Sequence, residues 1–311
     1  MINSVLGPIR PEELGFTLMH EHIATINISM NKAFPSWFNR EETIMKAVNQ
    51  LKYAKTLGLN TIVDATPINL GRDIRLLREV SEKSGIQIIA STGLYHVEEP
   101  FLMGWRADDL AELLIHEVEE GIQGTKVKPG VIKCASEKKI TKDNEKLLKV
   151  AALLHGNSRL PVITHSSCVS RNGIEQQRIL LENGVDPEKL VIGHCGDTTD
   201  IDYIEAILEN GSSIGLDRFG IDTLSPMNSR VETCVELCIK GYENQIVLSH
   251  DYNVFIDWFP KKSYISYKEA NMPNWSFHHI MTDIIPLLLE KGVTKKQIKT
   301  MTVDNPIEIL G

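Results

Sequence analysis

The sequence lacks the features that mark membrane, secreted and nucleic-acid-binding proteins. No apolar run approaches the roughly 18 residues that span a bilayer. The chain begins Met-Ile-Asn-Ser-Val-Leu-Gly-Pro, without the basic segment and apolar stretch of a secretory signal peptide. Its net charge of −8 argues against a nucleic-acid partner, because proteins that bind a phosphate backbone usually carry a basic face. We therefore expect a cytoplasmic protein that binds neither membrane nor nucleic acid.

Motifs of several common chemistries are also missing. The five cysteines are odd in number and form no CxxC pair, which favours a reduced compartment over a disulfide framework. The sequence contains no Walker phosphate-binding loop and no GxSxG nucleophile turn. Nucleotide binding through a Walker loop and serine hydrolysis at such a turn are therefore not indicated.

What the chain does contain is a regular series of short apolar runs. Each of the eight is short enough to be a buried strand, and most end in Gly, Ser, Thr, His or Asp. They are 17–23, 61–66, 87–93, 131–136, 161–167, 190–196, 212–219 and 246–252.

Helical patterns lie between these runs. Segments 42–57 and 143–154 show helical periodicity, and Asp108 opens a third segment with Leu110, Leu113, Leu114 and Val118 on one stripe. Alternating strands and helices indicate βα units with a parallel sheet. We predict a single-domain (β/α)8 barrel over residues 1–311. The alternative, a doubly wound sheet, usually has a glycine-rich turn after its first strand, where this chain has histidines.

Residues 254–277 differ from the other connections. They hold seven of the 19 aromatic residues, and connections of this length in compact domains are often functional. We read the segment as a substrate loop, either a buried cap on the barrel rim or an apolar wall for substrate, and the two roles are compatible.

Histidines end the first apolar run. Side chains at i and i+2 of a strand point the same way, so His20 and His22 are expected to face the barrel axis together. A metal ion is a common reason for two adjacent buried imidazoles. Core packing and surface exposure are the alternatives at this point.

Three further polar residues follow strands at the end where barrel enzymes build their active sites. His165, His194 and Asp251 lie near the ends of the fifth, sixth and eighth runs. A single such histidine is more often structural, and Asp251 could cap a helix. Their coincidence with His20 and His22 favours a metal site.

Lys133 lies inside the apolar run Val-Ile-Lys-Cys-Ala. A buried ammonium is costly, so the side chain must either reach solvent or react as a neutral amine. Cys134, Cys195 and His250 each neighbour a candidate ligand on its strand. They are therefore expected to face away from the barrel axis.

These residues together resemble the phosphotriesterase family of the amidohydrolase superfamily. The match covers essentially the whole chain in strand order, from His20-Glu21-His22 through Lys133, His165 and Gly193-His194 to Ser249-His250-Asp251. Segments 18–22, 120–125, 173–181 and 215–220 are similar to the phosphotriesterase-like lactonases, a branch that hydrolyses lactones, including N-acyl homoserine lactones, and often organophosphates slowly.

The resemblance implies a role for each residue. His20, His22 and Asp251 would hold one divalent metal ion, and His165 and His194 a second. Lys133, carboxylated by CO2 to N6-carboxylysine, would bridge them. Zinc is the first candidate for the metal, with cobalt, manganese or iron as alternatives.

The other implied roles concern substrate. Tyr95 and Arg218 would line the lactone pocket and act with Asp251 in catalysis, and Trp258 and Trp275 would contact substrate. Packing at the rim is the alternative for Tyr95, and pairing with Asp217 or Asp257 is the alternative for Arg218.

The expected reaction is lactone ring opening by a metal-bridging hydroxide, with organophosphate triesterase activity as a side reaction. Lys261, Lys262 and Lys268 in the aromatic segment raise a second possibility, a phosphorylated sugar lactonase of the same family. A metal-binding barrel without turnover is the remaining alternative. The family also implies a homodimer.

Overall fold

The main sheet of this computed structural model, which describes residues 1–97 and 99–311, contains only parallel pairs. Its strand order is β10-β9-β8-β7-β6-β5-β4-β3-β11. The strands are β3 (Phe16–Thr25), β4 (Leu59–Asp64), β5 (Gln87–Gly93), β6 (Val131–Ala135), β7 (Val162–His165), β8 (Leu190–Ile192), β9 (Ser213–Leu216), β10 (Ile246–Leu248) and β11 (Asn253–Ile256). Seven of the predicted runs match one strand each, and the eighth contains β10.

The ring closes between the last strands and the first. β11 pairs with β3, with Asn253 opposite His22. Between β10 and β11, the backbone N–H of Asp251 donates to the carbonyl of His20 at 3.0 Å, and Tyr252 accepts from the N–H of His22 at 2.9 Å. β10 and β11 together thus occupy the eighth barrel position, and the predicted (β/α)8 fold is confirmed.

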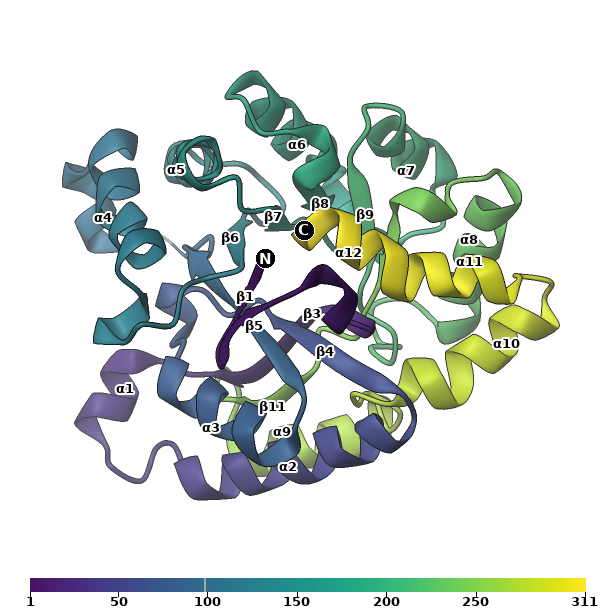
Figure 1. Ribbon diagram of the computed structural model, residues 1–311, viewed down its shortest axis with the longest axis horizontal. Helices are drawn as coiled ribbons and strands as arrows, with labels where there is room; N and C mark the ends of the chain where they lie inside the picture. Colours follow the sequence, from purple (N-terminus) through teal and green to yellow (C-terminus); the bar gives the residue numbers. More distant parts are fainter. Residues whose placement is uncertain (98) are drawn as a thin grey trace.

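Helices surround the ring of strands (Figure 1). They are α1 (Ile28–Ala33), α2 (Arg40–Thr56), α3 (Ile74–Ser84), α4 (Ala107–Glu119), α5 (Lys142–Ser158), α6 (Asn172–Glu182), α7 (Ile201–Leu208), α8 (Met227–Ile239), α9 (Lys261–Asn271), α10 (Ile285–Glu290), α11 (Lys295–Lys299) and α12 (Asn305–Leu310). Asn39 caps α2 and Thr141 caps α5 by accepting backbone N–H groups, which satisfies donors that the helices themselves leave free.

Two sequence predictions need correction. The sequence pattern predicts Leu113 on one stripe with Leu110 and Leu114, but Leu113 is 56% exposed, because the face that packs on the barrel runs through Leu110, Ala111 and Leu114. The segment 254–277 is not a plain loop. It contains most of β11 and all of α9.

Two apolar layers hold the barrel together. Inside the ring lie Met19, Val63, Ile89, Val131, Ile163, Val191 and Val247. The same cluster includes residues of the hairpin β1 (Ile2–Ser4) and β2 (Gly7–Ile9) and of α12. The hairpin and this helix therefore close one end of the barrel, where both termini lie in Figure 1.

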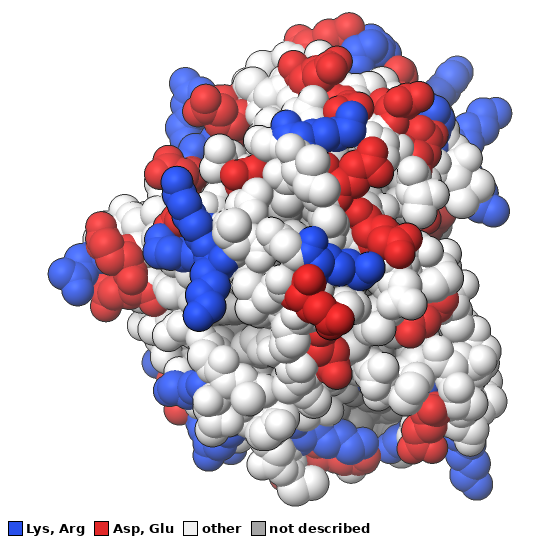
Figure 2. Space-filling view, turned by 90° about the vertical axis from the view of Figure 1, so that its right-hand side faces the viewer, with Lys and Arg blue, Asp and Glu red and all other residues white. Residues whose placement is uncertain are grey.

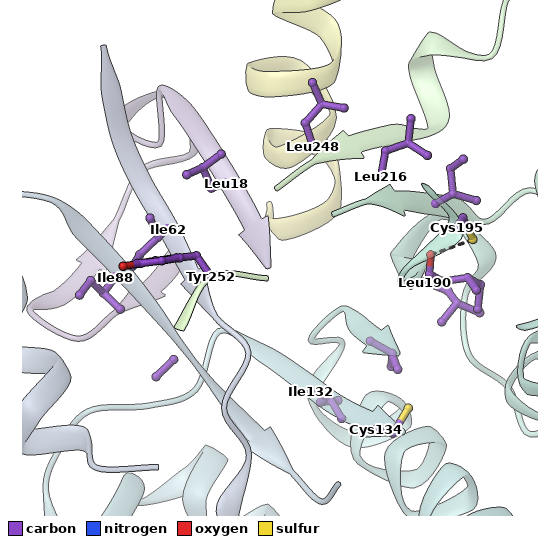
Figure 3. Close-up of a cluster of buried hydrophobic side chains, with 14 of the residues drawn as sticks. Leu18, Ile62, Ile88, Ile132, Cys134, Leu190, Cys195, Leu216, Leu248 and Tyr252 are labelled. Carbon is purple, nitrogen blue, oxygen red and sulfur yellow. Dashed lines mark hydrogen bonds between the residues drawn. The ribbon is translucent and has the colours of Figure 1, made fainter. Parts of the chain in front are cut away.

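The outer apolar layer fills the space between strands and helices. Alternate strand residues such as Leu18, Ile62, Ile88 and Ile132 belong to it, and Figure 3 shows them with both strand-end cysteines. Cys134 and Cys195 are among these residues. Their predicted orientation away from the barrel axis is confirmed.

The charge pattern is mixed on the face that Figure 2 shows, where Lys and Arg are interspersed with Asp and Glu and form no single-sign stripe. Among the described residues, no helix has the length and apolar character needed to cross a membrane.

Candidate metal centre and substrate cavity

The six residues predicted to hold metal come together at the carboxyl ends of the barrel strands. His20 and His22 lie on β3, Lys133 on β6 and His165 at the end of β7. His194 and Asp251 follow β8 and β10. All six form a continuous set of contacts at one end of the barrel.

The first pair of histidines shares the carboxylate of Asp251. Its Oδ1 lies 3.0 Å from Nε2 of His22 and 3.6 Å from Nε2 of His20. Met19, the residue before His20, also points into the barrel. The pairing of β3 with β4 shifts register between Leu18 and Glu21. Because a shift of this kind changes the direction in which side chains point, the neighbours Met19 and His20 can both face the barrel interior.

Two of the six candidate ligands have a left-handed backbone conformation, which sets the direction of their side chains. His194 has φ of 65° and Asp251 has φ of 55°, values that are uncommon for residues other than glycine and concentrate at functional sites. Gly193 allows the first of these turns, because a Cβ there would lie 2.2 Å from the carbonyl oxygen of Thr164. The local sequence Gly-His therefore fits a close approach of β7 and the residue after β8.

His165 and His194 face each other. The Nδ1 atom of His165 lies 2.9 Å from Nε2 of His194 and 3.2 Å from the hydroxyl of Tyr95. Burial lowers the pKa of His165 to about 3 and that of His194 well below its ordinary value. Both imidazoles are therefore neutral near pH 7, which is the form that binds metals.

Lys133 is fully enclosed at 1% exposure, with its Nζ 2.8 Å from Nε2 of His20. Burial lowers the pKa of its amine to about 8, although Asp251 and Asp217 oppose the shift. Of the two alternatives raised by the sequence, the structure contradicts a lysine that reaches solvent.

The donor set fits divalent metal ions. The ligand atoms of His20, His22 and Asp251 lie within 4.8 Å of one another, and so do those of His20, His194 and Asp217. Imidazole nitrogens with carboxylate oxygens are the ligands of zinc and similar metals. These groups are candidate metal-binding sites.

Asp217 is a supporting residue for which the sequence suggested only a partner role to Arg218. One oxygen accepts from Nδ1 of His20 at 2.8 Å, and the other lies 2.9 Å from Nδ1 of His194. It is buried, at 1% exposure. Its position directly after β9 was the only signal in the sequence.

Arg218 has other partners than those considered from the sequence. It contacts Asp197 at 2.8 Å and Asp251 at 2.9 Å, not Asp217 or Asp257. Burial acts to lower the pKa of Arg218, but these carboxylates outweigh it and raise the pKa. Asp257 accepts instead from Trp37 Nε1 and from a backbone N–H. The ion pair fixes the outer oxygen of Asp251.

His250 faces away from the cluster, as predicted. Its Nδ1 lies 2.8 Å from Glu21, and its Nε2 accepts the backbone N–H of Ile280 at 3.0 Å. Glu21 also accepts from the backbone N–H of Tyr252 and from the hydroxyl of Ser249. The middle residue of the His-Glu-His segment thus ties β3 to the residues on both sides of Asp251.

A cavity of about 810 Å³ opens beside the cluster. Five of the six predicted ligands line it, and His194 contacts His165 but is not part of the lining. Tyr95, Arg218, Trp258 and Trp275, the predicted substrate contacts, are part of its wall. The aromatic segment adds Phe259, Tyr264 and Tyr267. Trp275 is 5% exposed and packs as part of the rim, whereas Trp258 is 51% exposed, so the segment both covers the rim and lines the cavity; contact with substrate stays a prediction.

A parallel barrel with His, Lys and Asp side chains gathered at its carboxyl ends defines a class of barrel proteins with a candidate metal centre. The model of the phosphotriesterase family matches residues 1–310, and the chain belongs to this family. The predicted resemblance is confirmed, and the protein is a hydrolase that acts on ester bonds.

The chain is similar to named relatives along nearly its whole length. An aryldialkylphosphatase of Saccharolobus solfataricus is 44% identical, with 96% of this chain and 95% of the relative covered. An N-acetyltaurine hydrolase of Tetraodon nigroviridis is 30% identical, with 99% and 97% covered. The solved structure of a phosphotriesterase from Mycobacterium tuberculosis superposes with a TM-score of 0.94 at 36% identity, covering 99% of this chain and 98% of the other.

Proposed function

We propose that the protein is a binuclear metal-dependent lactonase that opens lactone rings with an apolar substituent, such as N-acyl homoserine lactones. The observation that carries this proposal is the aromatic cavity, which opens directly onto the cluster of ligand-type side chains. Ring opening needs both parts, a polar end for the ester and an apolar wall for the substituent.

The division of ligands is the one that the family resemblance implies, and the contacts of the cluster are compatible with it. His20, His22 and Asp251 would hold one cation, His165 and His194 the other, and carboxylated Lys133 would be shared by both. The neutral amine that burial favours at Lys133 is the form that reacts with CO2. When bound, such a pair of cations polarises a carbonyl group and lowers the pKa of a water molecule toward about 7.

Asp251 is the group proposed to move the proton. Burial acts to raise the pKa of its carboxyl, but Arg218 and His20 outweigh it and hold the pKa well below its ordinary value. The carboxylate is therefore ionised and able to accept the proton of the attacking water. A new bond forms between the water oxygen and the carbonyl carbon, the ring C–O bond breaks, and Asp251 delivers the proton to the leaving alkoxide.

Tyr95 and Arg218 are proposed to bind and orient the lactone. Burial raises the pKa of Tyr95, so its hydroxyl remains a hydrogen-bond donor that can stabilise the negative charge on the carbonyl oxygen. Arg218 keeps its charge and fixes Asp251 through the ion pair. Trp258 and Trp275 line the part of the wall where an acyl chain would lie, excluding water and restricting its orientation.

The lysines of the aromatic segment do not support a phosphorylated substrate. Lys261 pairs with Glu42 at 3.1 Å, and Lys268 lies over the ring of Tyr252 at 4.1 Å. Lys261, Lys262 and Lys268 are all absent from the lining of the cavity. Organophosphate hydrolysis is a second candidate activity. The printed name of the 44% identical relative, an aryldialkylphosphatase, favours it.

The test is a substrate panel with the purified protein reconstituted in turn with zinc, cobalt, manganese and iron. Acyl homoserine lactones of graded chain length, aldonolactone phosphates and an aryl dialkyl phosphate are compared by kcat/KM. We expect the longer acyl lactones to be hydrolysed fastest and the phosphate triester slowly. Faster turnover of the aldonolactone phosphates, or no turnover with any metal, would contradict the proposal.

A further inference from the structure

A third group of ligand-type side chains lies at the edge of the cluster. Nε2 of His165 is 3.2 Å from Oε1 of Glu137, and Nε2 of His96 is 3.4 Å from the same oxygen. The three residues come from different places, the end of β7, the connection after β6 and the connection after β5. Neither Glu137 nor His96 has a role in the mechanism above.

The two ring nitrogens of His165 point to different partners. Nδ1 faces His194 and Tyr95, while Nε2 faces Glu137. An imidazole that donates its proton through one nitrogen offers the lone pair of the other. A hydrogen bond from Nε2 to Glu137 therefore leaves the lone pair of Nδ1 directed at the centre of the cluster.

The other three candidate histidines follow the same plan. In each of them Nδ1 contacts an oxygen atom. Nδ1 of His20 lies 2.8 Å from Asp217, Nδ1 of His194 lies 2.9 Å from Asp217, and Nδ1 of His22 lies 2.8 Å from the hydroxyl of Thr66. Oxygen partners of this kind fix the tautomer and the ring orientation of metal-binding histidines. His165 fits the pattern only if Glu137 is its partner.

The backbone around Glu137 is held in place by buried amides of α6. The side-chain amide of Asn172 donates to the carbonyl oxygen of Glu137 and, at 3.0 Å, to the hydroxyl of Ser136. Gln176 donates to the same hydroxyl at 2.6 Å and to the carbonyl of His165 at 2.7 Å. The backbones of Glu137 and His165 are thus fixed relative to each other.

The side chain of Glu137 is less enclosed. It is 51% exposed and lines the cavity, whereas Asp217 is 1% exposed. An exposed carboxylate samples several rotamers unless a second contact holds it. His96, at 21% exposure, supplies that contact to the same oxygen, Oε1.

From this arrangement we propose that Glu137 is a positioning residue for His165 and that His96 holds Glu137 in place. The inference rests on the proposed function, because His165 is a metal ligand only in that scheme. It assigns to this pair the part that Asp217 and Thr66 play for the other histidines.

The test measures metal affinity, independently of turnover. Glu137→Gln, Glu137→Asp and His96→Phe are compared with the wild type by titrating zinc into the metal-free protein against a chelator of known affinity. Glu145→Gln on α5, which removes a surface carboxylate paired with Lys149, is the matched control.

We expect Glu137→Gln to weaken one of the two zinc sites by about 10-fold or more, within the range typical for partners of metal-binding histidines, and to leave the other site nearly unchanged. His96→Phe should have a smaller effect on the same site. Glu137→Asp, which keeps the charge on a shorter side chain, should retain more affinity than Glu137→Gln. The control variant should bind zinc with wild-type affinity. The melting temperatures of the metal-free variants should equal that of the metal-free wild type.

Three results would overturn the inference. If the wild type binds two zinc ions and Glu137→Gln binds both with unchanged affinity, the positioning role is excluded and the proposed function is not. Loss of a third zinc equivalent in Glu137→Gln and His96→Phe would show that the pair binds a cation itself. Wild-type protein that binds no zinc and hydrolyses no lactone would overturn the proposed function, and this inference with it.

Discussion

Lys133 is the residue at which burial and chemistry conflict most directly. Its side chain is fully enclosed and lies against His20, a neighbour that offers no negative charge. A protonated amine there would remain without full compensation, and the pKa of about 8 shows that the neutral form is within reach near pH 7. Conversion to a carbamate would replace an uncompensated buried cation with an anion that two metal ions attract.

Replacing Lys133 with Ala should therefore remove one of two bound metals and lower kcat/KM for the best lactone by more than about 100-fold. Metal analysis and steady-state kinetics measure both effects. Lys133→Met, which keeps most of the buried volume, separates loss of the bridge from loss of packing, and circular dichroism checks the fold. Full activity with two bound metals in either variant would exclude the carbamate.

Asp251 combines a left-handed backbone with a carboxylate that contacts both His22 and Arg218. Asparagine tolerates this backbone region well, so Asp251→Asn should fold normally. It should reduce kcat by about 10²–10⁴-fold, the usual contribution of a general acid–base group. Thermal unfolding and the lactone assay provide the two measurements. A wild-type kcat would show that another group moves the proton.

At the residue scale, the sequence predicted the ligand-type residues better than their supports. Position at a strand end, together with side-chain alternation, was enough to find His20, His22, His165 and Asp251. The partner of an imidazole, in contrast, comes from any neighbouring strand. Asp217, which bridges His20 and His194, could not be assigned without the spatial order of the strands.

At the scale of elements, hydrophobic pattern predicted the strands of the inner sheet because both of their faces are buried. It failed where an element is short or half exposed. β11 holds four residues, of which only Asn253 is fully buried, so no apolar run marked it. α9 contains no buried residue, and its periodicity was hidden by the aromatic residues that face the cavity.

Lys268 on α9 offers a test of how this helix packs on the barrel rim. Its amine lies over Tyr252 and Trp275, and burial, with Lys46 as a smaller cause, lowers its pKa to about 8. In the unfolded chain the pKa returns to its ordinary value, so the unfolded state binds more protons between these two values. The folded state should therefore gain stability as the pH rises above about 8.

We expect the free energy of unfolding of the wild type to rise by about 1–2 kcal/mol relative to Lys268→Met between pH 7 and pH 9.5, less than a fully buried amine would give. Urea denaturation at several pH values measures this difference. Lys261→Met on the same helix, whose lysine is exposed and paired with Glu42, is the control. If the difference in free energy of unfolding between the wild type and Lys268→Met does not change with pH, the amine of Lys268 is in contact with solvent.

At the scale of the whole molecule, the two ends of the barrel differ in composition. One end is filled by apolar side chains and closed by the N-terminal hairpin and α12. The other holds the buried polar groups His20, His22, Lys133, His194 and Asp217, with the partly buried Asp251 beside them. Burying such groups without full compensation opposes folding, and barrel folds accept this cost at the end that carries function. The molecule is thus built with its stability at one end and its chemistry at the other.

Removal of metal should consequently destabilise the polar end. A ligand that binds only the folded state at 100 times its Kd adds about 2.7 kcal/mol, which for a chain of 311 residues corresponds to a melting temperature higher by about 4 °C. We expect the chelator-treated protein to melt lower by at least this amount and to recover when zinc is restored. Lys133→Ala, which lacks the proposed bridge, should show a smaller recovery in the same calorimetric experiment. If the metal-free and metal-loaded proteins melt at the same temperature, the cluster does not bind metal tightly, and its buried nitrogens must be stabilised by their contacts with Asp217 and Asp251 alone.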